Sequence, residues 1–253
     1  MRLLCSNDDG ILAAGLACLQ RAAEPLGEVY VVAPDREQSA TSHSLTLHHP
    51  LRPVQLDERR WQVDGTPTDC VMLAIEALMP HRPDFVLSGV NHGPNMGEDV
   101  LYSGTVAAAM EGLALGVPSI AVSFAGRPGV GRAGDFDAYV ASLSALLSHL
   151  ISLPDFPPDT LLNVNIPPIP ADQVRGVKLT RLGRRVFSDS IARMKDPWGK
   201  PIFWIGGGSV TWSEGEGTDV DAIRAGYISV TPLHLDITHQ ARLEDADRWW
   251  KVP

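Results

Sequence analysis

Three short polar segments carry the side chains best suited to chemistry in this sequence. The first, NDDG, contains Asp8 and Asp9, the second contains Ser39, and the third contains Asn91. Adjacent carboxylates repel each other, and in a partly desolvated site they need a cation to offset that repulsion. Carboxylate, hydroxyl and amide oxygens, without Cys or His, favour a hard cation such as Mg²⁺ or Mn²⁺ over Zn²⁺. These side chains predict a site for one divalent cation, although NDDG alone also suits an ordinary turn.

A predicted helix after the third segment adds a feature suited to phosphate. Ser103 or Thr105 can cap the Ala-rich run that follows. The free N–H groups and the positive end of the helix dipole attract anions. A helix start that binds no ligand has the same sequence signal. This helix start comes just after a candidate metal-binding segment, which favours a phosphate site. A cation and a helix N-terminus together would let an acidic protein bind phosphate without a basic patch.

Apolar runs alternate with helical patterns over the first two-thirds of the chain. The runs are continuous, which indicates parallel strands covered on both faces. We therefore predict an α/β fold with a doubly wound, mostly parallel sheet. Strands are predicted over 2–6, 28–33, 84–90, 119–124 and 161–166, and helices over 12–25, from Thr66 or Thr68, over 105–115 and over 136–151.

Each polar segment comes directly after one of these predicted strands. In an open parallel sheet the carboxyl ends of the strands lie along one edge, and ligands bind in the crevice there. The three segments are therefore expected to converge in space.

The sequence changes in character after about residue 170. Strand-like runs are separated there by polar or Gly-rich stretches with little helical signal. We expect a long β excursion followed by a returning strand. A segment with so little core of its own is suited to packing against a second subunit.

Composition argues against a protein that coats nucleic acid, is exported or spans a membrane. The chain has 253 residues and a formal net charge of -9, whereas proteins that coat nucleic acid usually carry a basic stripe. Its three cysteines form no CxxC pair, so we expect the reduced thiols of a cytoplasmic protein. MRLLCSNDDG does not read as a signal peptide, and no apolar run is long enough to span a membrane. We expect neither a nucleic acid polymer nor a membrane as partner.

Several stretches resemble the survival protein E (SurE) family of nucleotidases. They occur in family order and cover nearly the whole chain. The matching stretches are LLCSNDDGILAAGL, VYVVAPDREQSATSHSLTL, VDGTPTDCV, DFVLSGVNHGPNMGEDVLYSGTVAAAMEG, GVPSIAVS, NVNIP, DPWGKPIFWIGG and GYISVTPLHLDIT.

The resemblance implies a Rossmann-like core with a protruding β-hairpin and a swapped C-terminal tail that forms homodimers, sometimes homotetramers. It implies one SurE-like domain over 1–253, with the α/β core over 1–170 and the hairpin, returning strand and tail over 171–253. Two departures from the family pattern are Ala40, where Gly is frequent, and Trp198, where Arg is frequent.

The resemblance also implies 5′-nucleotidase activity on nucleoside monophosphates, often with 3′-nucleotidase and polyphosphate-cleaving activity. The family's metal ligands map onto Asp8, Asp9, Ser39 and Asn91, the same four residues that the predicted topology brings together. Positions near the bound phosphate map onto Asn95, Ser103 and Thr105, with Gly104 between the last two. A Mg²⁺ or Mn²⁺ ion per subunit is the implied cofactor.

We hypothesise metal-assisted hydrolysis with Asp8, Asp9 and Asn95 as catalytic residues. A covalent aspartyl-phosphate route is the competing mechanism, and His43 or His92 is a candidate proton shuttle. A non-catalytic nucleotide-binding regulator is the alternative function. A receiver-type phosphoacceptor is disfavoured, because the chain has Asn where a receiver needs an acceptor Asp and has no Lys before residue 178.

Overall fold

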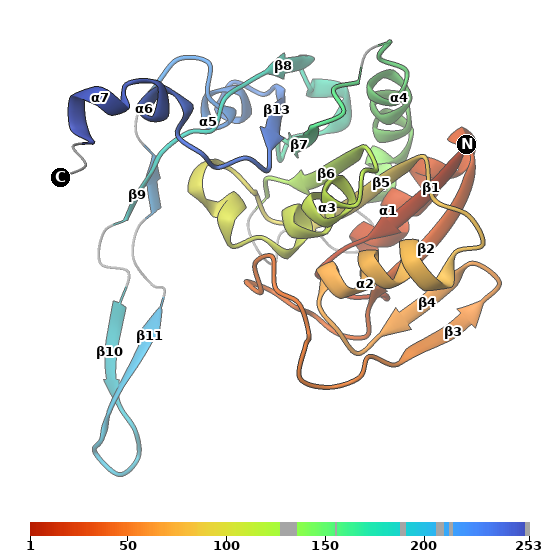
Figure 1. The fold of residues 1–253 in the computed structure, drawn as a ribbon, viewed down its shortest axis with the longest axis horizontal. Coiled ribbons are helices and arrows are strands. Elements are labelled where there is room, and N and C mark those ends of the chain that lie inside the picture. The colour runs from red at the N-terminus through yellow and green to blue at the C-terminus, as the bar shows by residue number, and fades with distance from the viewer. Residues whose placement is uncertain (127–135, 155, 188–190, 206–209, 213–214, 251–253) are drawn as a thin grey trace.

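The computed structural model describes residues 1–126, 136–154, 156–187, 191–205, 210–212 and 215–250. Strands and helices alternate over most of this range (Figure 1). The strands are β1 (Arg2–Ser6), β2 (Glu28–Pro34), β3 (Pro53–Asp57), β4 (Arg60–Val63), β5 (Phe85–His92), β6 (Ser119–Phe124), β7 (Thr160–Ile166), β8 (Val177–Leu179), β9 (Arg185–Phe187), β10 (Ile191–Lys195), β11 (Pro201–Ile205), β12 (Val210–Trp212) and β13 (Ile228–His234). The α-helices are α1 (Ala14–Ala23), α2 (Pro67–Leu73), α3 (Gly104–Ala114), α4 (Val140–Ile151), α5 (Asp219–Arg224), α6 (Gln240–Glu244) and α7 (Ala246–Trp249).

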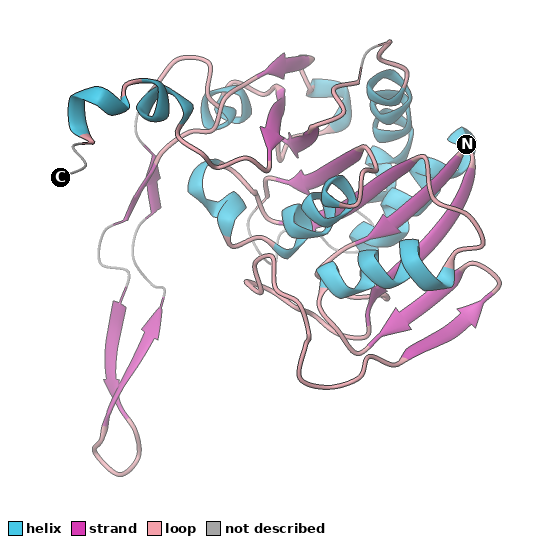
Figure 2. Cartoon of the chain, in the orientation of Figure 1, coloured by secondary structure: helices cyan, strands magenta, loops and turns pink. Residues whose placement is uncertain are grey.

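One mixed sheet organises the molecule (Figure 2). It has nine strands in the order β3-β4-β2-β1-β5-β6-β7-β13-β8. The pairs β3·β4 and β7·β13 are antiparallel, and the other neighbours are parallel. The mostly parallel α/β sheet confirms the predicted fold class.

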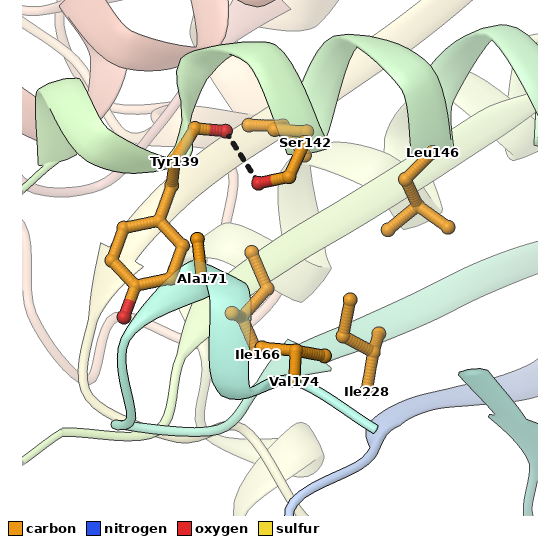
Figure 3. Close-up of a pocket in the computed structure, with 8 residues that line it drawn as sticks. Tyr139, Ser142, Leu146, Ile166, Ala171, Val174 and Ile228 are labelled. Atoms are coloured by element: carbon orange, nitrogen blue, oxygen red, sulfur yellow. Dashed lines mark hydrogen bonds between the residues drawn. The ribbon is translucent and has the colours of Figure 1, made fainter. Parts of the chain in front are cut away.

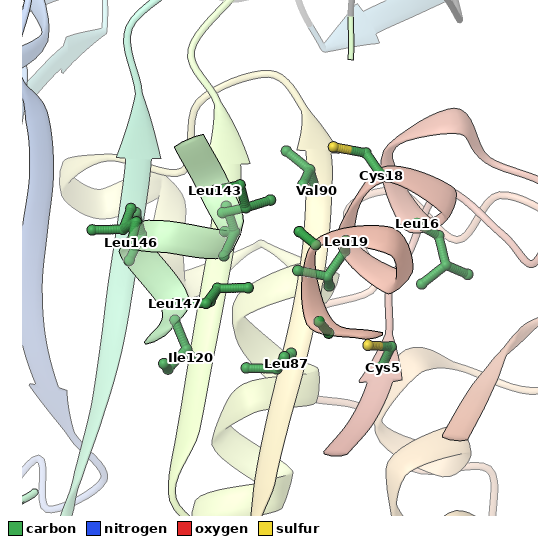
Figure 4. Packing of buried hydrophobic residues seen from close by; sticks show 14 of the residues in the cluster. Cys5, Leu16, Cys18, Leu19, Leu87, Val90, Ile120, Leu143, Leu146 and Leu147 are labelled. Atoms are coloured by element: carbon green, nitrogen blue, oxygen red, sulfur yellow. The ribbon is translucent and has the colours of Figure 1, made fainter. Parts of the chain in front are cut away.

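Hydrophobic cores form on both faces of this sheet, because successive residues of a strand point to opposite sides. On β1, Cys5 lies in one cluster with Leu19 of α1 and Leu147 of α4 (Figure 4). Its neighbour Leu4 lies in a second cluster with Val71 of α2. The continuous apolar runs of the central strands follow from this two-sided burial. None of the helices in the described ranges combines the length and apolar character needed to cross a bilayer.

The predicted element boundaries agree closely with the structure in the central sheet. The β6 strand covers the predicted residues. Thr66 is the N-cap of α2, its side chain accepts from Asp69 N in a capping box, and Pro67 is in the first turn. Ser103, not Thr105, caps α3. The predicted helix over 136–151 is instead a 3₁₀ turn (Phe136–Tyr139) followed by α4.

The prediction missed one pair of strands and the short C-terminal helices. The β3 residues are all exposed, and β4 has four residues of mixed polarity, so neither gives a continuous apolar signal. The helices α5, α6 and α7 have six, five and four residues, too few for a helical period to stand out.

A hairpin of β10 and β11, here called the arm, extends away from the sheet (Figure 1). It exposes several large apolar side chains, including Trp198 at 83%, Trp204 at 63% and Ile205 at 89%. The protruding hairpin agrees with the expected fold. The use of the C-terminal tail in dimerisation stays a prediction.

The close contact between α1 and β5 leads to a test of stability. A Cβ atom at Gly15 would lie 1.9 Å from the carbonyl oxygen of Val90. Gly15→Ala should therefore lower the free energy of unfolding by about 1–3 kcal/mol through overpacking, although Ala in a helix interior ordinarily adds about 0.5–1 kcal/mol. Chemical unfolding of both proteins measures the difference. Ala17→Ser, on the exposed side of the same helix, is the control, and a Gly15→Ala variant as stable as wild type would contradict the packing described.

Candidate functional site

The three polar segments converge at one edge of the sheet. They lie at the carboxyl ends of β1, β2 and β5, which are adjacent in the order β2-β1-β5. Backbone hydrogen bonds join the first two segments: Gln38 N donates to Asp8 O and Ile11 N donates to Pro34 O, each at 2.8 Å. The third segment joins them through His92, whose backbone N donates to Asp9 Oδ2 at 3.2 Å. The expected convergence is therefore present.

Asp8 is a buried carboxylate beside the first residues of α3. Its side chain is 6% exposed, and its Oδ1 accepts a hydrogen bond from the hydroxyl of Thr105. A Cβ atom at Gly104 would lie 2.7 Å from Asp8 Cβ and 3.0 Å from Asp8 Oδ2, so only glycine allows this approach. Burial raises the pKa of Asp8 to about 6, the negative charge of Asp9 adds to that rise, and the bond from Thr105 opposes it.

Asp9 is fixed by a single residue of the third segment. Its Oδ2 accepts from both the backbone N and the Nδ1 of His92, each at 3.2 Å. The hydrogen bond to Asp9 raises the pKa of His92, and partial burial works in the opposite direction. No hydrogen bond from the described residues reaches Asp9 Oδ1, which leaves that oxygen available to a ligand.

The side chain of Asn91 is oriented for a ligand, whereas that of Ser39 is bound to a neighbouring residue. Asn91 Nδ2 donates to Gly93 O at 2.9 Å, and this bond orients the amide and directs its Oδ1 away from that contact. The exposed Ser39 hydroxyl donates to Glu37 Oε1 at 2.6 Å, so it is near Asp8 only through the neighbouring Gln38. Ala40 has a φ of 56°, in the region that favours glycine.

The residues present fit a hard divalent cation. Asp8 is a buried carboxylate next to a second one, and without a cation its pKa rises toward neutrality. The oxygens on offer are carboxylate, amide and hydroxyl oxygens, as Mg²⁺ and Mn²⁺ prefer. Within the described ranges, no three His, Cys, Asp or Glu side chains form a group that could hold a metal. A cation here would therefore depend on Asn91 or Ser39 as well as on the aspartates.

Asn95 is held rigidly by polar residues that the sequence reasoning missed. Its backbone O accepts from Asn163 Nδ2 at 2.8 Å and from Asn165 Nδ2 at 3.0 Å, and its backbone N donates to Asn165 Oδ1 at 2.9 Å. Its own Nδ2 donates to Ser123 Oγ at 2.8 Å. The available signal was the pair of asparagines two residues apart in a buried strand, which places both side chains on one face.

The N-terminus of α3 lies next to the aspartates. Ser103 is 7% exposed, and its Oγ accepts from Val106 N at 3.1 Å. The first N–H groups of a helix have no intrahelical acceptor, so those of Gly104 and Thr105 are suited to an anion. The structure thus brings together Asp8, Asp9, Asn91, Gly104 and Thr105 around one corner of the sheet.

Two other features lie outside this arrangement. His43 Nε2 is 2.8 Å from the buried Glu111 carboxylate on α3, so this histidine is engaged in holding its loop. A separate cavity of about 160 Å³ lies beside α4 (Figure 3). Its lining carries no ionisable group other than a tyrosine, which does not suit phosphate: Tyr139, Ser142, Leu143, Leu146, Ile166, Ala171, Val174 and Ile228.

The chain is similar to proteins of one family along its whole length. The family model for Survival protein SurE matches residues 3–189. The 5′-nucleotidase SurE of Gemmatimonas aurantiaca is 72% identical over 254 residues, with 100% of each chain covered. That of Geotalea uraniireducens is 48% identical over 249 residues, covering 98% of this chain and 99% of the relative. The crystal structure of the SurE protein from Aquifex aeolicus matches with a TM-score of 0.84 and 41% identity, covering 98% of this chain and 99% of that one.

The raised pKa of Asp8 predicts how stability changes with pH. Because the folded-state value of about 6 exceeds the usual 3.8, the folded protein retains a proton that the unfolded chain releases. This contribution is fully present below about pH 4 and is lost as the pH rises through about 6, a change of up to about 3 kcal/mol. In EDTA, wild type should therefore lose stability relative to Asp8→Asn over that range, as measured by chemical unfolding.

Asp172→Asn serves as the control, because this aspartate is exposed and lies outside the site. Its stability, measured over the same pH range, is the reference for a substitution of the same kind at an exposed position. A difference between wild type and Asp8→Asn that is constant from about pH 4 to about pH 7 would contradict the raised pKa.

Proposed function

The chain belongs to the Survival protein SurE family, and from this premise we propose that it is a divalent-metal-dependent 5′-nucleotidase. It would hydrolyse nucleoside monophosphates to a nucleoside and phosphate. The observation that carries the proposal is the burial of Asp8, beside Asp9, against the N-terminus of α3. In that arrangement two adjacent carboxylates are stabilised by binding a cation, and the N–H groups at the start of α3 can donate to a phosphate group.

One Mg²⁺ or Mn²⁺ ion per subunit would be held by Asp8, Asp9, Ser39 and Asn91. When bound, the ion supplies Lewis-acid stabilisation of phosphoryl charge and lowers the pKa of a water ligand. The available Oδ1 of Asp9 and the oriented amide of Asn91 support this assignment. Ser39 would need to exchange its bond with Glu37 for the ion.

The phosphate group would be held by the segment that enters α3. The backbone N–H groups of Gly104 and Thr105 can donate to phosphate oxygens, and Ser103 sits at the same turn. Asn95 is proposed to contact the phosphate from its fixed position against β7. Rigid donors of this kind stabilise developing charge without reorganising during the reaction.

In the proposed reaction a water oxygen attacks phosphorus and the phosphorus–oxygen ester bond breaks. Asp9 accepts the proton of the attacking water, and a solvent water protonates the leaving alkoxide. The competing route, attack by an aspartate carboxylate, would leave phosphate covalently bound to Asp8 or Asp9.

Several further properties belong to the same proposal. The enzyme would be a cytoplasmic homodimer or homotetramer and would form one SurE-like domain over 1–253. Activity on 3′-nucleotides and on short polyphosphate would accompany the main activity. The exposed apolar side chains of the arm support the existence of a contact between subunits.

The most direct test of the activity is the Asp9→Asn variant. Losing this proton acceptor should lower kcat/KM for AMP in the presence of Mn²⁺ by at least about a hundredfold, with an unchanged circular dichroism spectrum. EDTA should abolish wild-type phosphate release, and added Mn²⁺ should restore it. The measurement is phosphate release over a panel of nucleotides.

Asp172→Asn is again the matched control and should keep wild-type turnover. Near-normal turnover of Asp9→Asn would contradict the proposed role of this aspartate. Tight nucleotide binding by the wild type without any phosphate release would instead favour the non-catalytic regulator.

A further inference from the structure

One buried carboxylate ties the segment that enters α3 to the base of the arm. Asp219, the first residue of α5, is 0% exposed. Its Oδ2 accepts from Gly97 N at 2.9 Å, and its Oδ1 accepts from Gly183 N and Val220 N, both at 2.8 Å. Gly97 begins the 3₁₀ turn that precedes α3, and Gly183 lies just before β9. A single side chain therefore joins two segments that are distant in the sequence.

The same two segments also touch directly. Gly97 has a φ of +51°, and a Cβ atom there would lie 2.7 Å from Gly183 O and 2.8 Å from the ring of Trp212 in β12. The strands β9 and β12 pair with each other and form the base of the arm. The segment before α3 thus contacts both the residues that lead into β9 and a side chain of β12.

A third set of contacts reinforces this junction. Arg185, the first residue of β9, donates from its backbone N to Glu98 Oε2 at 2.5 Å, and its guanidinium donates to the Asp99 carboxylate. Three successive residues are therefore held at this junction. Gly97 is bound to Asp219, and Glu98 and Asp99 are bound to Arg185 of β9.

The bound residues lead directly to the proposed phosphate donors. A 3₁₀ turn (Gly97–Leu101) runs into Ser103, the cap of α3. Thr105, two residues later, donates to Asp8. We propose that Asp219 is a positioning residue that fixes the phosphate-binding segment 95–105 against the base of the arm, so that phosphate affinity depends on a contact outside the site. This inference rests on the proposed function, because that function assigns phosphate to the segment.

The substitution Asp219→Asn separates the contacts of this side chain. Its one remaining carbonyl oxygen can still accept from Gly183 N and Val220 N, while the new NH₂ group faces Gly97 N. A donor then meets a donor, and only the bond to Gly97 is lost. The opposite orientation of the amide would place the NH₂ group against two N–H donors, so it is disfavoured.

The test compares wild type, Asp219→Asn and Asp221→Asn as full-length proteins. Asp221 lies in the same helix, is partly exposed, and accepts no hydrogen bond through its side chain from the described residues, so it is the matched control. Hydrogen exchange is followed by mass spectrometry in peptides covering 95–101 and 181–185. Calorimetry measures the Kd of inorganic phosphate in the presence of Mn²⁺, and turnover of AMP gives kcat and KM.

In Asp219→Asn we expect exchange in 95–101 to rise about tenfold or more, as for the loss of a hydrogen bond to a charged group, with 181–185 unchanged. The Kd of phosphate and the KM should rise roughly tenfold while kcat changes by less than about threefold, the pattern of lost binding common to ground and transition states. Asp221→Asn should match wild type in all of these measurements.

An unchanged Kd, or an equal rise of exchange in both peptides, would overturn the inference, because the latter is what general loosening produces. The two proposals fail separately. A wild type that releases no phosphate from AMP refutes the proposed function, whereas the exchange and phosphate-binding results still decide the role of Asp219.

Discussion

The organisation of the site depends on a carboxylate that is almost shielded from water. Asp8 is 6% exposed, lies next to Asp9 and is pressed against Gly104 at the start of α3. Burial of this charge is unfavourable unless hydrogen bonds and a cation offset it. The Thr105 hydroxyl supplies one such bond. This one bond does not offset the whole cost of burying the charge. The cost that remains explains the raised pKa of Asp8 and is the reason for proposing a cation.

The surroundings of Asp8 come from the whole chain and not only from its N-terminal strand. Neighbouring strands β2 and β5 bring the other two polar segments to it. The proposed phosphate-binding segment before α3 depends on later residues: Asn163 and Asn165 hold Asn95, and Asp219 holds Gly97. An acidic protein can thus present a positive environment to phosphate through a cation held by the three polar segments and through the backbone amides that begin α3. Polar side chains in the second half of the chain fix the segment that leads to those amides.

The sequence predicts the parts of this structure that follow from local pattern. Continuous apolar runs indicated the central strands, and the rule that ligands bind at the carboxyl ends of parallel strands indicated where Asp8, Asp9 and Asn91 would meet. Links between distant residues were not predictable in this way. Asn163 and Asn95 are 68 residues apart, and Asp219 and Gly97 are 122 apart, so no local period connects them. The hydroxyl of Ser39 points to Glu37 because of a loop conformation that apolar patterning does not encode.

Anomalous diffraction from crystals of the protein grown with saturating Mn²⁺ tests the central claim most directly. We predict one manganese peak per subunit, coordinated by oxygens of Asp8, Asp9, Ser39 and Asn91. A map with no peak among these side chains, or with manganese bound only elsewhere, would contradict the view that a cation offsets the buried charge of Asp8.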